Sequence, residues 1–382
     1  SGACAALLPA DCTDNLACSA DLCDGAQGCT PNQPAIDGSL CDDGSPCTAL
    51  DACMNGACAA GKPLLWAQNI GGAGDETFQD VTPLPNGALV AVGMAASGSL
   101  GLQAWLTVRD AAGGKVVDQL YGGSGDDWFH AVAARPAGGF VAVGRRSDAG
   151  SKAWLVGTNA KGAIEWQQTP IGGSDLQAVV PRWGGGYTAA GNIDPNKGRV
   201  VELTESGGIL QDLVLSGPQA TLVIDGIAAA PSGGYWAVGE TWKDTNWADS
   251  DAWLGRIAAS GALAISKAFG NPGQTDYLIG VVADSGGCTA VGRWSPTAAS
   301  SVWLVRFDNA GTKVWENQLA GLANGRGYAL VGLGDGGYAL AGAYKPGADY
   351  HPLVARSDAL GNLLWQDAPE LAHAWTGLTV AT

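Results

Sequence analysis

Segment 240–251 concentrates side chains with usable chemistry in one short stretch of the chain. Trp242 and Trp247 are five residues apart, with Asp244, Asn246 and Asp249 beside them. Flat indole rings supply stacking area, while carboxylates and an amide can fix hydroxyl groups by hydrogen bonds. This combination suits a sugar or a polar peptide. The segment therefore predicts a binding loop.

The same segment offers hard oxygen ligands at spaced positions. Asp244, Asp249 and Asp251 are acidic residues of the kind that binds Ca²⁺ rather than a transition metal. Their spacing matches no complete calcium-binding loop, and acid-rich loops are usually only solvated. Calcium is therefore the one cofactor that the sequence suggests.

Side chains that could catalyse a reaction are few. The three histidines are His130, His351 and His373, and no nucleophile-elbow phrase occurs. Adjacent acidic residues such as Asp126 and Asp127 keep glycosidase or lyase chemistry open. However, the pair belongs to a loop that recurs along the chain, where Asp more often closes a turn by bonding to the backbone. Catalysis is the less favoured hypothesis.

These residues are set in a chain that repeats itself from Lys62 onward. An aromatic or apolar residue followed by a V-A-V-G-like phrase recurs six times, and the closing glycines are 47 to 53 residues apart. Each unit has the pattern of four short strands, a to d, with no helical period. Such units stack around an axis as β-propeller blades. The occurrences are residues 89–93, 140–144, 187–191, 235–239, 288–292 and 338–342.

The blade number depends on two surplus strands. Segments 64–70 and 374–382 resemble strands d and a without the rest of a blade. They either help to close a six-bladed ring or belong to a seventh blade; six is our prediction. Tryptophans of strands c and d, such as Trp154 and Trp166, should pack between blades. The repeats resemble the tandem WD-like propeller repeats of secreted bacterial and archaeal proteins, and this resemblance implies architecture rather than activity.

Loops d–a and b–c should share one face of the propeller, where propellers usually bind ligands. Tryptophans outside the repeated pattern fall mainly in these loops, beside charged residues. The alternative is that these rings plug the channel mouth and pack the loops. The predicted binding residues are Trp128, Trp242, Asp244, Asn246, Trp247, Asp251, Arg293 and Trp294.

Nine of the ten cysteines precede residue 60, in a segment that has no aromatic residue and many aspartates. So little apolar area cannot offset the ordering entropy, and the spacing fits no zinc site, so disulfides are expected. The segment resembles the CDDG-x-x-CT-x-x-D-x-C modules of secreted and surface proteins of myxobacteria. Cys288 should be a buried free thiol. The expected disulfides join residues among Cys12, Cys18, Cys23, Cys29, Cys41, Cys47, Cys53 and Cys58.

A formal charge of −16 argues against binding to nucleic acid or an anionic membrane, and no apolar run is long enough to span a bilayer. We therefore expect a disulfide-stapled module, residues 1–61, followed by a propeller, residues 62–382. The expected location is extracellular or on the outer cell surface, with a signal segment already removed. The predicted function is non-catalytic binding or adhesion to a glycan or protein partner on the loop face. The alternatives are a polysaccharide or peptide lyase or hydrolase at the tunnel mouth, and a structural spacer.

Overall fold

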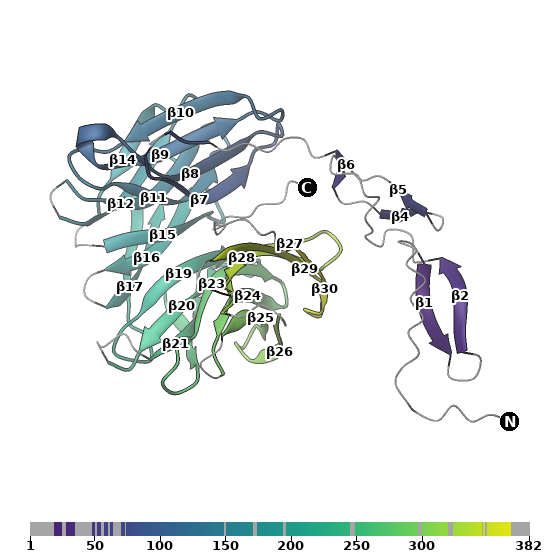
Figure 1. The fold of residues 1–382 in the computed structure, drawn as a ribbon. Helices are drawn as coiled ribbons and strands as arrows, with labels where there is room; N and C mark the ends of the chain where they lie inside the picture. Colours follow the sequence, from purple (N-terminus) through teal and green to yellow (C-terminus); the bar gives the residue numbers. More distant parts are fainter. Residues whose placement is uncertain are drawn as a thin grey trace. The chain divides into compact units, whose positions relative to one another are not determined.

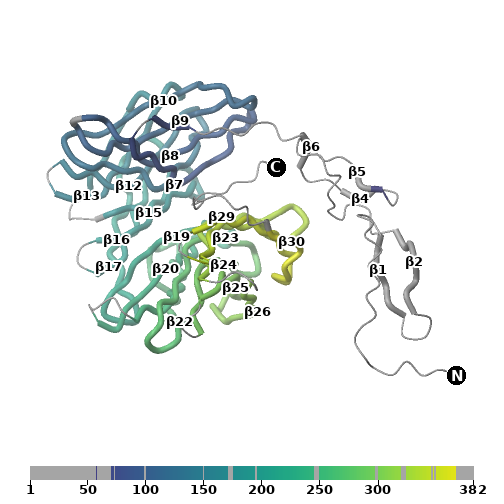
Figure 2. Tube along the Cα trace, in the orientation of Figure 1, coloured from purple at the N-terminus to yellow at the C-terminus, as the bar shows by residue number. Residues whose placement is uncertain are grey.

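The computed structural model separates the chain into two compact units, Ser1–Asn69 and Ile70–Thr382. Figure 1 shows the strands of both units, and Figure 2 traces the chain through them. The predicted domain boundary near residue 61 falls among residues that are not described. The structure describes residues 19–24, 28–34, 48–49, 52–54, 57–59, 62–63, 70–72, 74–148, 150–170, 174–193, 196–244, 249–296, 300–319, 324–345, 347 and 350–367.

The described residues of the first unit form three short antiparallel strand pairs. In backbone register, Cys23 lies opposite Cys29 and Cys53 lies opposite Cys58. The predicted disulfides themselves stay a prediction. The pairs are β1 (Ser19–Asp24) with β2 (Gly28–Pro34), β3 (Thr48–Ala49) with β6 (Lys62–Pro63), and β4 (Ala52–Met54) with β5 (Ala57–Ala59).

The second unit contains six four-stranded antiparallel sheets that follow one another in sequence order (Figure 1). Blade 1 consists of β7 (Glu76–Pro83), β8 (Leu89–Ala96), the 3₁₀ turn η1 (Gly98–Leu100), β9 (Leu102–Arg109) and β10 (Lys115–Tyr121). Blade 2 consists of β11 (Trp128–Ala134), β12 (Phe140–Arg146), β13 (Lys152–Thr158) and β14 (Ile164–Gln168). Blade 3 consists of β15 (Ser174–Pro181), β16 (Tyr187–Ile193), β17 (Lys197–Leu203) and β18 (Ile209–Leu215).

The remaining three blades repeat this plan. Blade 4 consists of β19 (Val223–Ala229), β20 (Tyr235–Trp242), β21 (Ser250–Ile257) and β22 (Leu263–Phe269). Blade 5 consists of β23 (Tyr277–Asp284), β24 (Gly287–Trp294), β25 (Ser301–Asp308) and β26 (Lys313–Gln318). Blade 6 consists of β27 (Arg326–Gly332), β28 (Tyr338–Tyr344), β29 (His351–Ser357) and β30 (Leu363–Asp367).

The all-β, six-bladed propeller predicted from the repeats is therefore confirmed. In each blade the first strand, strand a, is the inner one, and strands b, c and d follow outward. Of the two surplus strands, residues 64–69 and 374–382 lie outside the described residues.

The hydrophobic core lies between consecutive blades. Five clusters of buried side chains each combine residues of two successive blades, from blades 1 and 2 to blades 5 and 6. Trp154, Trp253 and Trp303 of strand c are buried members of these clusters. The prediction that these tryptophans pack between blades is confirmed.

A side-chain hydrogen bond from strand c to strand d, thirteen residues further along the chain, recurs in blades 1 to 5. Trp105 Nε1 donates to Asp118 Oδ1 at 2.6 Å, and Trp303 Nε1 donates to Glu316 Oε2 at 2.9 Å. In blade 3 Arg199 replaces the tryptophan, and its Nε donates to Asp212 Oδ1 at 2.8 Å. The blade therefore keeps the c–d link although the ring is lost.

Each inner strand contains a β-bulge at the same position, opposite the glycine that closes the repeated phrase. In blade 2, a Cβ on Gly144 would overlap the carbonyl oxygen of Trp128, and the equivalent glycine of every other blade has the same close approach. The bulge therefore requires glycine on strand b. The residues left without a register partner, the bulge residues, are Gln79, His130, Gln177, Asp225, Ile279 and Tyr328.

Candidate binding site in the central cavity

A cavity of about 390 Å³ lies among the six inner strands, and all six bulge residues line it. Each bulge residue is half-buried, as expected of a side chain at a cavity wall. A bulge re-aims a side chain that a regular ladder would pair. The fold thus brings six chemically different side chains from six repeats to one place.

The residue after the bulge is small in blades 2 to 6, because the inner strands approach one another closely there. A Cβ on Gly226, for example, would overlap the carbonyl oxygen of Ile279 in the next blade. Blades 2, 3 and 6 have alanine at this position, and blade 5 has glycine. These small residues leave the space of the cavity to the bulge residues.

Blade 1 differs, because Asp80 follows its bulge. Its Oδ2 accepts a hydrogen bond from the backbone N–H of Val132 in blade 2 at 2.8 Å, and its Oδ1 accepts one from Val81 at 2.8 Å. Burial raises the pKa of Asp80 to about 6, against the lowering effect of these two N–H groups. Asp80 therefore links blade 1 to blade 2 at the cavity wall.

The residue two positions before each bulge faces the same side of its strand, since strand side chains alternate. Each of these residues is paired in register with the residue after the repeated glycine of strand b. We name these twelve the mouth residues. The pairs are Thr77 with Met94, Trp128 with Arg145, Asp175 with Asn192, Val223 with Glu240, Tyr277 with Arg293, and Arg326 with Ala343.

The mouth of blades 2 and 3 is organised around His130. Its Nε2 lies 3.1 Å from Asp175 Oδ1, and its ring meets the ring of Trp128 edge-on at 5.8 Å. The Arg145 guanidinium carbon lies 4.4 Å from the centre of the Trp128 ring, so the indole contacts both a cation and an imidazole. Trp128, a predicted binding residue, therefore stands at the cavity mouth.

Blade 4 places two carboxyl groups near each other, Asp225 in the cavity and Glu240 at the mouth. Burial, and then repulsion by Glu240, raise the pKa of Asp225 well above its usual range. Burial raises the pKa of Glu240 to about 7, although a hydrogen bond from Ser250 favours its charged form. Neither group has an ion pair with a Lys, Arg or His side chain among the described residues.

Blades 5 and 6 contribute phenols and guanidinium groups. Burial raises the pKa of Tyr277, while Arg326 and Arg293 act in the opposite direction, so its hydroxyl stays neutral. The guanidinium carbon of Arg326 lies 4.9 Å from the centre of the Tyr350 ring. Arg293, a predicted binding residue, donates from Nε to Ser295 Oγ at 3.3 Å.

The expectation that Trp242 is an exposed ring in a loop is wrong. It is the last residue of β20 and only 5% exposed, and its backbone N–H donates to Thr221 Oγ1 at 3.1 Å. Strand b extends three residues past Gly239 in this blade, which draws the indole into the protein. Trp294 is also packed, with its ring 4.6 Å from that of Trp303. The packing alternative applies to both rings.

The acidic side chains of the 240–251 segment do not surround an open cation site. The Nζ of Lys243 lies 3.6 Å from Asp249 and 3.9 Å from Asp251, and Gln219 donates to Asp251. Among the described residues no group of three acidic, His or Cys side chains could hold a metal ion. Asp244 is exposed, whereas Asn246 and Trp247 lie outside the described residues. Calcium binding stays a prediction.

The repeated aspartates close turns, as the sequence indicates. Asp127 is buried, and its carboxylate accepts hydrogen bonds from the backbone N–H groups of Gly123 at 2.7 Å and Ser147 at 2.8 Å.

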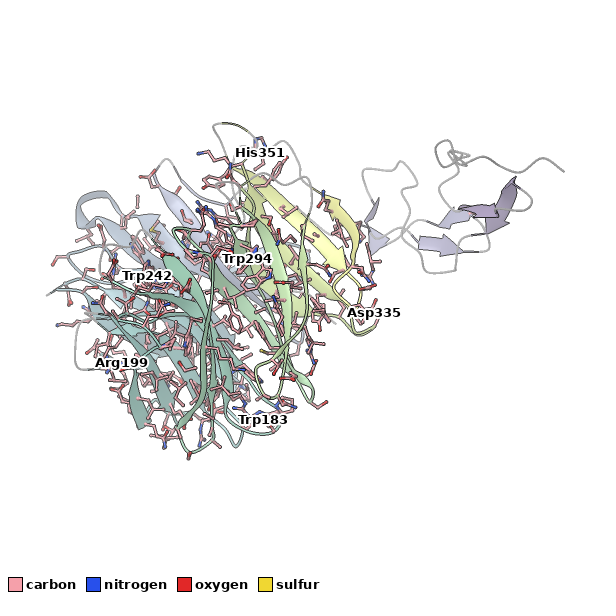
Figure 3. The ribbon with its side chains drawn as sticks, turned by 90° about the horizontal axis from the view of Figure 1, so that it is seen from below. Trp183, Arg199, Trp242, Trp294, Asp335 and His351 are labelled. Carbon is pink, nitrogen blue, oxygen red and sulfur yellow. The ribbon has the colours of Figure 1, made fainter. Side chains whose placement is uncertain are left out.

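Figure 3 shows Trp183, in an a–b turn, and His351, at the start of β29, at opposite ends of the propeller. His373 and Trp375 lie outside the described residues.

None of the six cavity-lining bulge residues is among the predicted binding residues, and the histidines, His130 included, entered the sequence analysis only as side chains that could catalyse a reaction. A usable signal exists in the sequence: one position per repeat, fourteen or so residues before the repeated glycine, changes its chemistry from blade to blade. Periodicity alone does not reveal that this position is a bulge, because the extra residue shifts the alternation that a strand pattern relies on.

No protein-family model matches the chain, and no curated protein matches it. Solved structures resemble it at low identity. A protein of unknown function from Bacteroides caccae is 13% identical over 73% of this chain and 93% of its own, with a TM-score of 0.43. The Neurospora crassa Pan2 WD40 domain is 10% identical over 75% and 87%, with a TM-score of 0.47. A puromycin hydrolase is 16% identical over 80% and 49%, with a TM-score of 0.49.

These similarities carry no argument about ligand or activity, so the proposals below depend on the residues of this chain. Among the described residues, no helix has the length and apolar character needed to cross a membrane.

Proposed function

We propose that this protein is a secreted or surface-displayed, non-catalytic binding propeller that takes a glycan in its central cavity, entered from the face of the d–a and b–c loops. The observation that carries the proposal is the set of bulge residues. A repeated frame presents six different side chains to one cavity, and function is usually added where repeats differ.

The chemistry of the cavity suits hydroxyl groups. Its wall combines two amides, an imidazole, two carboxyl groups and a phenol, which donate and accept hydrogen bonds. A volume of about 390 Å³ lies within the range of small-ligand sites, about 300–1,000 Å³. A short glycan segment has the size and polarity for this space.

Unused donors at the mouth support a polar ligand. Trp128 Nε1, Arg145 Nε and Arg326 Nε are buried and have no hydrogen-bond partner among the described residues. A buried N–H group without a partner costs about 1–3 kcal/mol, so these groups favour a ligand or water that can accept from them.

The test is to fill the cavity. A glycan array identifies binding sugars, and calorimetry then compares the wild type with Gln177→Trp, which places an indole in the cavity. We expect at least a tenfold loss of affinity. Val214→Trp is the matched control, because Val214 is 52% exposed on β18. If Gln177→Trp binds as tightly as the control, the ligand does not enter the cavity and the proposal fails.

The His130–Asp175 pair favours a second candidate, hydrolysis or elimination of a polysaccharide or peptide at the mouth. A carboxylate 3.1 Å from an imidazole can orient it as a general base. Chromatography of a bound glycan after prolonged incubation distinguishes the two functions. An enzyme shortens the glycan, and Asp175→Asn stops this, whereas a binding protein leaves it intact.

A further inference from the structure

Asp225 and Glu240 are the feature of the cavity that binding of neutral hydroxyl groups does not explain. They come from neighbouring strands of blade 4 and repel each other. Ionising two neighbouring carboxyl groups in a partly desolvated place costs free energy, unless the two share a proton or a cation compensates their charge. No Lys, Arg or His of the described residues forms an ion pair with either group.

The cations nearby are engaged elsewhere. Arg145 lies over Trp128, Arg326 lies over Tyr350, and Lys243 faces Asp249 and Asp251. Arg293 bonds to Ser295 and acts on Tyr277 rather than on the acidic pair. His130 is paired with Asp175 in blade 3. Among the described residues, the acidic pair therefore lacks a protein cation, and one of its two members, Asp225, lines the cavity.

Two tyrosine rings lie at the cavity or near the acidic pair. Tyr328 lines the cavity, and Tyr277 lies close enough to Glu240 to feel its charge. Phenol rings attract ammonium groups, and carboxylates bind them through charge-assisted hydrogen bonds. Ser250 lies near Glu240 and favours its charged form, while its hydroxyl donates to the carbonyl oxygen of Asp276 at 3.3 Å.

We infer that the cavity recognises a primary ammonium group, held between Asp225 and Glu240, and that its ligand is a glycan with a free amino sugar. This inference rests on the proposed glycan-binding function and names the class of sugar. A neutral N-acetylated sugar has the same ring and hydroxyl groups but cannot compensate the two carboxylates.

The experiment is calorimetry with three probes: a glucosamine tetramer, an N-acetylglucosamine tetramer, and a blocked tripeptide with a central lysine. We expect the glucosamine tetramer to bind at least tenfold more tightly than its N-acetylated counterpart. Its affinity should rise between pH 5 and pH 7, because the Glu240 carboxyl group, with a pKa of about 7, must ionise to hold the cation.

Asp225→Asn and Glu240→Gln should each weaken binding of the glucosamine tetramer at least tenfold. Glu165→Gln, on outer strand β14, removes the same charge and should leave binding unchanged. The cavity variants should melt at or above the wild-type temperature, because they remove a repulsion, so lost binding would not reflect unfolding.

The outcomes separate the inference from the proposed function. If both tetramers bind equally, or the cavity variants bind normally, the ammonium site is wrong while the glycan cavity stands. If only the lysine peptide binds, and Asp225→Asn abolishes this, the ammonium site stands and the glycan proposal is overturned. If none of the three probes binds, the inference is wrong.

Discussion

The indole of Trp242 is 5% exposed at the end of β20, so its removal opens a cavity in the protein. We expect Trp242→Ala to lower the free energy of unfolding by about 3–5 kcal/mol, as for other buried tryptophans. Urea denaturation measures this change. Trp183→Ala is the control, since that ring is 61% exposed and its loss should cost less than about 0.5 kcal/mol. Equal stability of the two variants would show that Trp242 does not pack.

Asp80 should make the stability of the propeller fall as pH rises. Its pKa is raised to about 6 in the folded protein, against about 3.9 for a free aspartate. Between these values the unfolded chain has released the proton and the folded chain still holds it, so the contribution to stability is full below pH 4 and lost by pH 6.

Asp80→Asn removes this titration. Unfolding free energies measured from pH 4 to pH 7 should therefore show a downward slope in the wild type that is reduced in the variant. Asp225 and Glu240 titrate in both proteins and cancel in the comparison. Parallel curves for the two proteins would contradict the raised pKa.

Within each blade, the bulge of strand a depends on the glycine opposite it on strand b. Gly144→Ala places a methyl group against the carbonyl oxygen of Trp128. The ladder must shift to accommodate it, and we expect a loss of about 1–3 kcal/mol, together with weaker ligand binding because His130 moves. Gly332→Ala, at the end of β27 with no neighbour near its Cβ, should change neither. Denaturation and calorimetry on both variants test this.

The elements themselves could be predicted from the sequence, whereas the site could not. The Gly-closed phrase at strand b and the tryptophans of strand c repeat, and repetition reveals strands that a single segment would leave ambiguous. Trp242 was wrongly placed in a loop, because the sequence after Gly239 does not show where strand b ends and the loop begins. Asp225 and Glu240 are fifteen residues apart in the chain, and only the bulge register brings them together.

At the scale of the whole molecule, the two units should respond differently to reduction. The structure shows Cys288 as a buried free thiol, as predicted, and burial raises its pKa to about 12. All tryptophans except Trp66 belong to Ile70–Thr382, so their fluorescence follows that unit. We expect thermal melting by fluorescence to be unchanged by a reducing agent. A lowered melting temperature would show that the cysteines before residue 60 support the propeller.

The bulges also make the propeller an attractive starting point for protein engineering. A bulge residue has no register partner on strand b, and its side chain lines the cavity. Exchanging that side chain should therefore change what the cavity recognises while the backbone hydrogen bonds of the blade remain. Combinatorial libraries restricted to the six bulge positions should yield many folded members with new selectivities. Because the cavity side chains and the backbone hydrogen bonds of the blade are independent, single substitutions at the bulges could also change the ligand during evolution, one blade at a time.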